Sequence, residues 1–161
     1  MKKILGIDPG STTIGYGVIG CNDKDSKLEV IGYGYINLKD TIGQEQRLVQ
    51  LHKDLKKIIA KYKPESVAIE NLYFFKNAKT HTAVLQSKGV ILFTAAEANL
   101  NIFEYTPLQV KQSVSGHGRA DKNLVQKLVR SSLNIKSDIR PDDASDALAI
   151  AICHHRHFIH S

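Results

Sequence analysis

The sequence predicts an α/β domain built on a mixed five-stranded sheet with helices on both faces. Strand-like runs come first and lie close together, and toward the C-terminus strands alternate with helical segments. Adjacent strands joined by short turns pair antiparallel, whereas strands separated by a helix pair in parallel and are covered on both faces. The 161 residues, 42% of them hydrophobic, suffice for one such domain spanning residues 1–161.

Three apolar runs rich in glycine, tyrosine and β-branched residues predict an antiparallel meander at the start of the chain. A polar turn at 22–26 separates the second from the third, as a hairpin requires. Two short apolar runs further along predict the strands that complete the sheet. In chain order, the five expected strands are 3–8, 14–20, 28–36, 66–69 and 101–105.

Helical periodicity fills the remainder of the chain. The first helix has leucines and isoleucines on one stripe and ends before Pro64. The second is apolar on most sides between Val90 and Ala96, so we expect it to be buried either at the domain centre or in a subunit interface. A Gly-containing basic loop is expected at 113–122. The expected helices are 43–62, 79–99, 106–111, 121–133 and 140–153.

The net charge and the cysteines indicate which class of binding partner and which cellular compartment to expect. The net charge is +6 and the pI about 9.3, which favours a polyanionic partner. Cys21 and Cys153 are far apart and match no metal-ligand spacing, so we expect reduced thiols in a cytoplasmic protein. No secretory leader and no apolar run of membrane-spanning length is evident, and no membrane partner is expected.

Acidic residues stand at positions where burial makes a carboxylate costly. Asp8 and Glu70 are each the first charge after an apolar strand, and parallel neighbours would bring both to the same sheet edge. Asp143 and Asp146 share one face of the last helix, and the apolar residues on that face direct them at the sheet. Converging carboxylates repel one another and favour a divalent cation such as Mg²⁺ or Mn²⁺.

Each acid alone has an ordinary structural explanation. Asp8 before Pro-Gly could close an Asx turn, and Glu70 could form a surface ion pair. Asp142 and Asp143 could serve the dipole of the helix that they open, and we accept this explanation for Asp142. The set of acids therefore carries the metal hypothesis, and no single member does.

The stretch "GIDPGST" also resembles the first phosphate loop of the actin, Hsp70 and sugar-kinase fold. A single-lobe nucleotide-binding ATPase or kinase fragment is therefore the alternative function. Two such lobes close around the nucleotide in that fold, and the length of this chain supplies one. The sequence shows no second phosphate loop and no adenosine motif.

Four blocks taken together are similar to a nuclease family. "GIDPGSTTIGYGVI", "VAIENLYFFKNAKT", "QVKQSVSGHGRADK" and "DDASDALAIAI" follow one another in an order that closely resembles the RuvC family of crossover-junction endodeoxyribonucleases. The resemblance implies an RNase H-like fold and a homodimer. It implies an Mg²⁺-dependent enzyme of recombination and DNA repair that resolves four-way (Holliday) junctions by symmetric paired nicking, with a RuvA–RuvB branch-migration complex as partner.

The same resemblance assigns roles to particular residues. The four metal ligands, which are also catalytic, fall on Asp8, Glu70, Asp143 and Asp146, and would hold two Mg²⁺ ions with Mn²⁺ as a possible substitute. The two functional lysines fall on Lys111, for phosphate positioning, and Lys122, for electrostatic stabilisation of the scissile phosphate. The aromatic residue presented to junction bases falls on Tyr73. Further expected phosphate contacts are Lys76, Lys79 and Arg119.

Two clusters leave alternatives open. Tyr73, Phe74 and Phe75 cannot all enter one core, so at least one ring should be exposed for base stacking while Phe74 or Phe75 packs inside. The C-terminal histidines could bind Zn²⁺, pair with the helix dipole or belong to a disordered tail. These histidines are His154, His155, His157 and His160.

Overall fold

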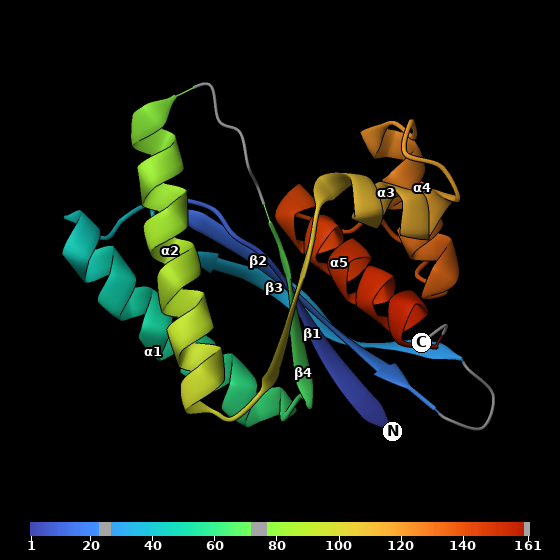
Figure 1. The fold of residues 1–161 in the computed structure, drawn as a ribbon, viewed down its shortest axis with the longest axis horizontal. Helices are drawn as coiled ribbons and strands as arrows, with labels where there is room; N and C mark the ends of the chain where they lie inside the picture. The colour runs from blue at the N-terminus through green and yellow to red at the C-terminus, as the bar shows by residue number, and fades with distance from the viewer. Residues whose placement is uncertain (23–26, 72–76, 160–161) are drawn as a thin grey trace.

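A five-stranded sheet lies between two layers of helices (Figure 1). The computed structural model describes residues 1–22, 27–71 and 77–159. The strands are β1 (Lys2–Asp8), β2 (Thr13–Cys21), β3 (Leu28–Asn37), β4 (Ser66–Glu70) and β5 (Asn101–Tyr105). The helices are α1 (Gln44–Tyr62), α2 (Ala78–Glu97), α3 (Pro107–Ser115), α4 (Lys122–Ser132) and α5 (Asp142–Ile159).

The sheet is mixed, as the sequence predicts, with the strand order β3-β2-β1-β4-β5. The first three strands form the antiparallel meander, and β4 and β5 add in parallel beside β1. Ile7 on β1 is in register with Ile69 on β4, so the next residue of each strand, Asp8 and Glu70, emerges at the same edge. The expectation that these two acids share an edge is therefore confirmed.

Each face of the sheet has its own hydrophobic core because strand side chains alternate between the faces. Leu5 and Ile7 face α1 and α2, where they pack with Leu51 and Ile91. Ile4 faces α5 and joins the second core. Figure 1 shows α1 and α2 on one side of the sheet, and α3, α4 and α5 on the other.

Helix α5 lies directly on the backbone of β1 and β2 because glycines remove the side chains that would separate them. A Cβ atom on Gly6 would lie 2.0 Å from the carbonyl oxygen of Ala147, and one on Gly15 would lie 2.0 Å from that of Asp143. Gly15 is itself the register partner of Asp8. The first turn of α5 is thereby held beside the end of β1.

Two helices extend beyond the expected ends. Helix α3 continues to Ser115 rather than 111, because Val114 is buried and the chain turns only at Gly116, whose φ of 84° is left-handed. Three residues of the expected basic loop are therefore helical. Helix α5 continues to Ile159 rather than 153, because His154 and His155 are buried and extend its packed face.

Helix α2 is not the central helix of the domain. Val84 and Ile91 are buried, but Leu85 and Phe93 leave 46% and 61% of their surface exposed, and a Cβ on Gly89 would meet nothing within 4 Å. The expectation that a single chain buries this helix at the domain centre is wrong, and the subunit-interface alternative remains. No helix within the described ranges is long and apolar enough to cross a membrane.

Candidate active site

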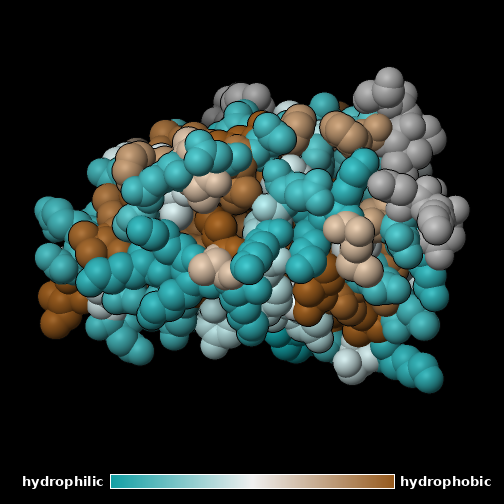
Figure 2. All heavy atoms as spheres, turned by 90° about the horizontal axis from the view of Figure 1, so that it is seen from below, coloured by the Kyte–Doolittle hydropathy of each residue, from teal (hydrophilic) through white to brown (hydrophobic). Residues whose placement is uncertain are grey.

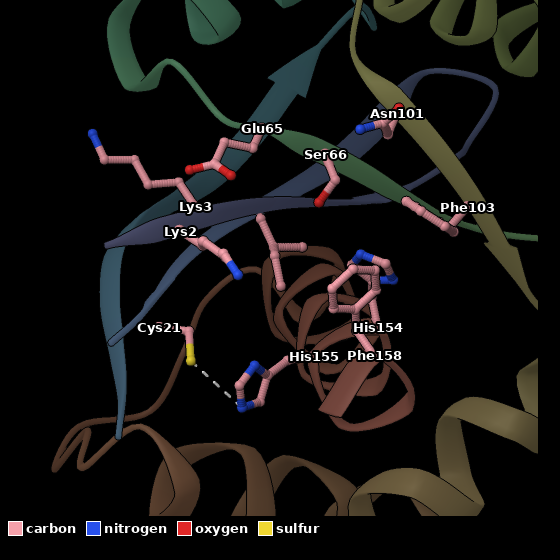
Figure 3. A pocket seen from close by; sticks show the side chains of 11 residues that line it. Lys2, Lys3, Cys21, Glu65, Ser66, Asn101, Phe103, His154, His155 and Phe158 are labelled. Atoms are coloured by element: carbon pink, nitrogen blue, oxygen red, sulfur yellow. Dashed lines mark hydrogen bonds between the residues drawn. The ribbon is translucent and has the colours of Figure 1, made fainter. Parts of the chain in front are cut away.

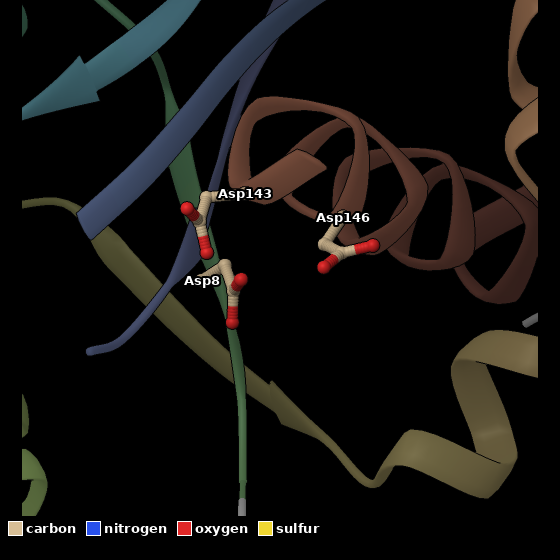
Figure 4. A group of neighbouring side chains, drawn as sticks. All are labelled: Asp8, Asp143 and Asp146. Atoms are coloured by element: carbon tan, nitrogen blue, oxygen red, sulfur yellow. The ribbon is translucent and has the colours of Figure 1, made fainter. Parts of the chain in front are cut away.

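Three aspartates from two elements meet at the end of the sheet where β1 and β4 finish (Figure 4). Asp8 ends β1, while Asp143 and Asp146 lie near the start of α5. One carboxylate oxygen from each residue lies within 4.8 Å of the corresponding oxygens of the other two. Side chains three residues apart share a helix face, and the contact of α5 with Gly15 aims that face at Asp8.

Glu70 joins this cluster from β4. Burial, followed by the nearby negative charge of Asp146, raises its pKa to about 7, whereas Lys111 acts in the opposite direction. Glu70 therefore shares the field of the aspartates, although it comes from a different strand. Three of the four acids named from the sequence therefore lie within metal-binding distance of one another, and Glu70 lies near them on the neighbouring strand.

Within the acid cluster, the pKa of Asp8 is raised the most. Burial, followed by the charges of Glu70, Asp146 and Asp143, raises the pKa of its carboxyl from an ordinary 3.8 to about 8. Lys122 only partly offsets them. Like charges held in a partly desolvated site favour protonation unless a cation takes the proton's place. The protein thus keeps acids together at a cost that a bound cation would remove.

The donor set suits a hard divalent cation. All four groups offer carboxylate oxygens, which Mg²⁺ and Mn²⁺ prefer over nitrogen or sulfur ligands. The oxygens of Asp8, Asp143 and Asp146 are already close enough to one another to bind one ion. The residues present therefore fit the divalent metals that the family resemblance implies.

Lys122 lies at the border of the acid cluster. It opens α4, and its Nζ lies 3.4 Å from Asp142 Oδ2 and 3.9 Å from Asp146 Oδ2. Asp142 also accepts a hydrogen bond from Arg140 at 3.0 Å. The carboxyl group of Asp142 is therefore held by surface cations, in line with our assignment of this residue outside the metal site.

The remaining predicted DNA contacts lie around this edge or outside the described ranges. Lys111 is exposed on α3 and close enough to lower the pKa of Glu70. Arg119, between α3 and α4, and Lys79, in the first turn of α2, are exposed. Residues that fall outside the described ranges are Tyr73, Phe74, Phe75 and Lys76.

Sequence reasoning missed a partly buried polar network behind Glu70. Lys88 Nζ on α2 forms an ion pair of 2.6 Å with Glu104 Oε1 on β5 and donates a hydrogen bond of 2.9 Å to Asn71 Oδ1. These partners are 16 and 17 residues away in the chain, so no local pattern links them. Lys88 itself gives no signal in the sequence, because the same helix also carries other polar residues such as Lys79 and Gln86.

The histidines at the end of α5 lie at the opposite end of the sheet, where β1, β4 and β5 begin (Figure 3). His154 Nδ1 and Tyr105 Oη are 2.7 Å apart, and His155 Nε2 lies 3.8 Å from Cys21 Sγ. Burial, with the neighbouring histidines, lowers the pKa of His154 to about 4. Up to Ile159 the chain is helical, so the tail explanation is wrong for His154, His155 and His157, whereas His160 lies outside the described residues.

These histidines line a cavity of about 370 Å³ together with the first residues of β1, β4 and β5. The surface at this end of the molecule is mostly hydrophilic, with hydrophobic residues showing between the polar side chains (Figure 2). Within the described ranges, the three aspartates form the only group of at least three acidic, histidine or cysteine side chains close enough to hold a metal. The Zn²⁺ hypothesis therefore gains no support from these residues.

The fold and the site together define the class. A central mixed sheet, with acids at the ends of β1 and β4 and on the final helix, has the architecture of RNase H-like nucleases. Within that class, the family model "Crossover junction endodeoxyribonuclease RuvC" matches residues 4–154. The chain belongs to the RuvC family.

Relatives and solved structures agree along nearly the whole chain. The chain is 47% identical to a RuvC of Caldicellulosiruptor saccharolyticus and 48% identical to one of Alkaliphilus oremlandii, in each case over 94% of this chain and 91% of the relative. RuvC of Thermus thermophilus in complex with a Holliday junction substrate superposes with a TM-score of 0.91 at 31% identity, covering 98% of this chain and 95% of that one.

The yeast mitochondrial resolvase Ydc2 shares the fold, with a TM-score of 0.69 at 17% identity over 96% of this chain and 79% of that one. Agreement with the RuvC family over residues 4–154 leaves the single-lobe ATPase or kinase alternative without support.

Proposed function

We propose that this protein is a structure-selective endonuclease that resolves four-way DNA junctions by nicking two opposed strands symmetrically, in recombination and DNA repair. One combined observation carries the proposal. Four acids gather at a single edge of the sheet, in a chain that matches along its length a RuvC solved with a Holliday junction substrate. The expected single domain, residues 1–161, contains all four acids.

The metal site that we propose holds two Mg²⁺ ions, for which Mn²⁺ could substitute. Asp8 would be the central ligand of this site, because β1 lies at the centre of the sheet. Glu70 and Asp146 would flank it, and Asp143 would complete one coordination shell. When bound, the two ions activate a water molecule and stabilise the departing 3′ oxygen.

The protein's own residues perform the rest of the task. Metal binding requires ionised carboxylates, so Asp8 releases its proton as the site fills. Lys122, at the border of the cluster, would stabilise charge that develops on the scissile phosphate. Lys111 would position the phosphate through its charge, which adds affinity without reading sequence.

We assign further DNA contacts to the surface around the acids. Tyr73 would stack on an unpaired base at the crossover, and Lys76, Lys79 and Arg119 would contact phosphates. Lys79 and Arg119 are exposed, as such contacts require. The overall charge of +6 supports a polyanionic substrate.

A homodimer would supply two active sites for paired nicks, and α2 offers a surface for it. Leu85, Gly89 and Phe93 are four residues apart and lie on one exposed stripe of this helix. A two-fold interface uses the same patch on both subunits, and a close-packed contact favours a small residue flanked by large apolar ones. We expect the reaction to take place in the cytoplasm, with a RuvA–RuvB complex as partner.

A comparison of substrates tests the proposed function. The purified protein is incubated with labelled four-way junction, linear duplex of the same sequence and RNA–DNA hybrid, with and without Mg²⁺. We expect Mg²⁺-dependent nicking of the junction alone. Cleavage of the hybrid would instead indicate an RNase H-type activity, and ATP hydrolysis without nicking would indicate the nucleotide-binding alternative.

A further inference from the structure

Lys88 connects the exposed helix α2 to the end of the strand that carries Glu70. Its Nζ contacts Glu104 Oε1 at 2.6 Å and Asn71 Oδ1 at 2.9 Å. Only 14% of the Lys88 side chain is exposed, so both contacts form in a partly desolvated space. Glu104 leaves 39% of its side chain exposed, so the pair is shielded from water at its Lys88 end. Ion pairs exposed at both ends contribute little by comparison.

The two partners of Lys88 lie on either side of the β4–β5 junction. Glu104 on β5 is in register with Ile69, the residue before Glu70. Asn71 is the residue after Glu70, and its backbone N–H donates to the carbonyl oxygen of Tyr105 at 2.8 Å. The hydrogen bonding between the strands therefore continues one residue beyond Glu70. At that point Lys88 contacts both chain segments, through Asn71 and Glu104.

Because side chains alternate along a strand, the Lys88 contacts lie on the face of the sheet opposite to the acid cluster. Glu70 faces α5 and the aspartates, whereas its neighbour Asn71 is held by α2 on the opposite face of the sheet. Repulsion from the like charge of Asp146 favours displacement of the Glu70 carboxylate from the site when no cation is present. A fixed backbone at Asn71 opposes that displacement.

We propose that Lys88 is a positioning residue that holds Glu70 in place for metal binding. This inference rests on the proposed function, because it assigns a support to one of the proposed ligands. Lys88 acts through Asn71 and Glu104 and touches neither metal nor DNA. Residues that support metal ligands in this way commonly alter metal affinity or activity by 10–100-fold when they are replaced.

The first test compares Lys88→Met, which keeps the apolar stem, with Lys88→Arg, which keeps the charge. Mn²⁺ affinity is measured by titration calorimetry without DNA, and the Mg²⁺ concentration for half-maximal junction cleavage is measured separately. We expect Lys88→Met to weaken both by about tenfold, and Lys88→Arg to recover most of the loss. Junction affinity in EDTA should change by less than about twofold, because phosphate contacts supply it.

Lys57→Met is the matched control, since Lys57 is also ion-paired, with Asp54 Oδ1 at 3.6 Å, but lies exposed on α1. It should leave Mn²⁺ affinity unchanged. Asn71→Ala tests the route: it should reproduce the Lys88→Met effect, and the double variant should lose less than the product of the single effects. An additive double variant would contradict action through Asn71.

The outcomes separate this inference from the proposed function. A wild-type protein that cleaves junctions, together with Lys88→Met that binds Mn²⁺ as tightly as wild type, overturns the role of Lys88 alone. A wild-type protein that binds Mn²⁺ but nicks no junction overturns the proposed function. Loss of Mn²⁺ affinity in Lys88→Met without recovery in Lys88→Arg would overturn the role of the charge.

Discussion

Replacing Asp8 by asparagine should stabilise the metal-free protein and remove most of its response to Mg²⁺. Burial and three neighbouring acids raise the pKa of Asp8 from 3.8 to about 8. The folded protein thus holds this proton more tightly than the unfolded chain. The stability that the raised pKa contributes is complete below about pH 4 and is lost as the pH rises through about 8.

The size of the effect follows from the two pKa values. Each pH unit between them is equivalent to about 1.4 kcal/mol, so the loss reaches at most about 5 kcal/mol at pH 8 and about 1.5 kcal/mol at pH 5. For a chain of 161 residues, 1 kcal/mol corresponds to roughly 2–4 °C in Tm. Asp8→Asn in EDTA should therefore raise Tm by up to about 10–20 °C at pH 8 and by about 3–6 °C at pH 5.

Thermal denaturation measured by circular dichroism, at both pH values, in EDTA and in Mg²⁺, checks this expectation. Mg²⁺ at pH 8 should raise the Tm of the wild-type protein and leave that of Asp8→Asn nearly unchanged. The matched control, Asp142→Asn, should respond to Mg²⁺ like wild type. A Tm for Asp8→Asn in EDTA equal to or below that of wild type at pH 8 would refute the electrostatic account of this site.

Four further outcomes are expected. Asp142→Asn should change the junction cleavage rate by less than about twofold, because exposed ion pairs contribute little. Asp143→Asn should abolish cleavage, and the reverse pattern would place the metal ligand one residue earlier. Gly15→Ala should lower stability by about 1–3 kcal/mol in urea denaturation and abolish cleavage, and wild-type behaviour would deny that α5 must touch β2. Tyr73→Ala should slow junction cleavage far more than it weakens duplex binding, and a junction with unpaired bases at the crossover should restore its activity. Tyr73→Phe should be close to wild type, and equal loss of activity in both variants would exclude stacking. Phe93→Asp should convert a dimer into a monomer in light scattering, and an unchanged mass would exclude this face of α2.

Local pattern alone was enough to predict the strands and the acids. Asp8 and Glu70 follow apolar strands directly, and the alternation of strand and helix makes those strands parallel neighbours. Asp143 and Asp146 have helical spacing, so their shared face did not depend on tertiary knowledge. The roles of these residues in metal binding remain predictions.

The errors arose where tertiary contacts outweigh local propensity. Serines and glycines suggested a loop at 113–122, but burial of Val114 keeps the chain helical to Ser115. The polar histidines suggested an end for the last helix, but Tyr105 and Cys21 provide buried partners for His154 and His155. In both places, partners distant in sequence determine where the helix ends.

The Lys88 network and the glycine contacts were invisible for a related reason. Lys88 has the same appearance in sequence as any solvated lysine, and only the pairing of β4 with β5 brings Asn71 and Glu104 to it. Gly15 has the appearance of an ordinary hairpin glycine until α5 is laid against it. Neither contact leaves a periodic signal.

The central claim is that one acid centre per subunit nicks opposed strands of a junction, and mapping the nicks tests it most directly. Each strand of an immobile four-way junction is labelled in turn, and products from wild type and Asp146→Asn are resolved on a sequencing gel in Mg²⁺. We predict nicks at equivalent positions on two opposed strands for wild type, and no nicks for Asp146→Asn while it still binds the junction. Unpaired nicks scattered over all four strands, or cleavage that survives in Asp146→Asn, would contradict the claim.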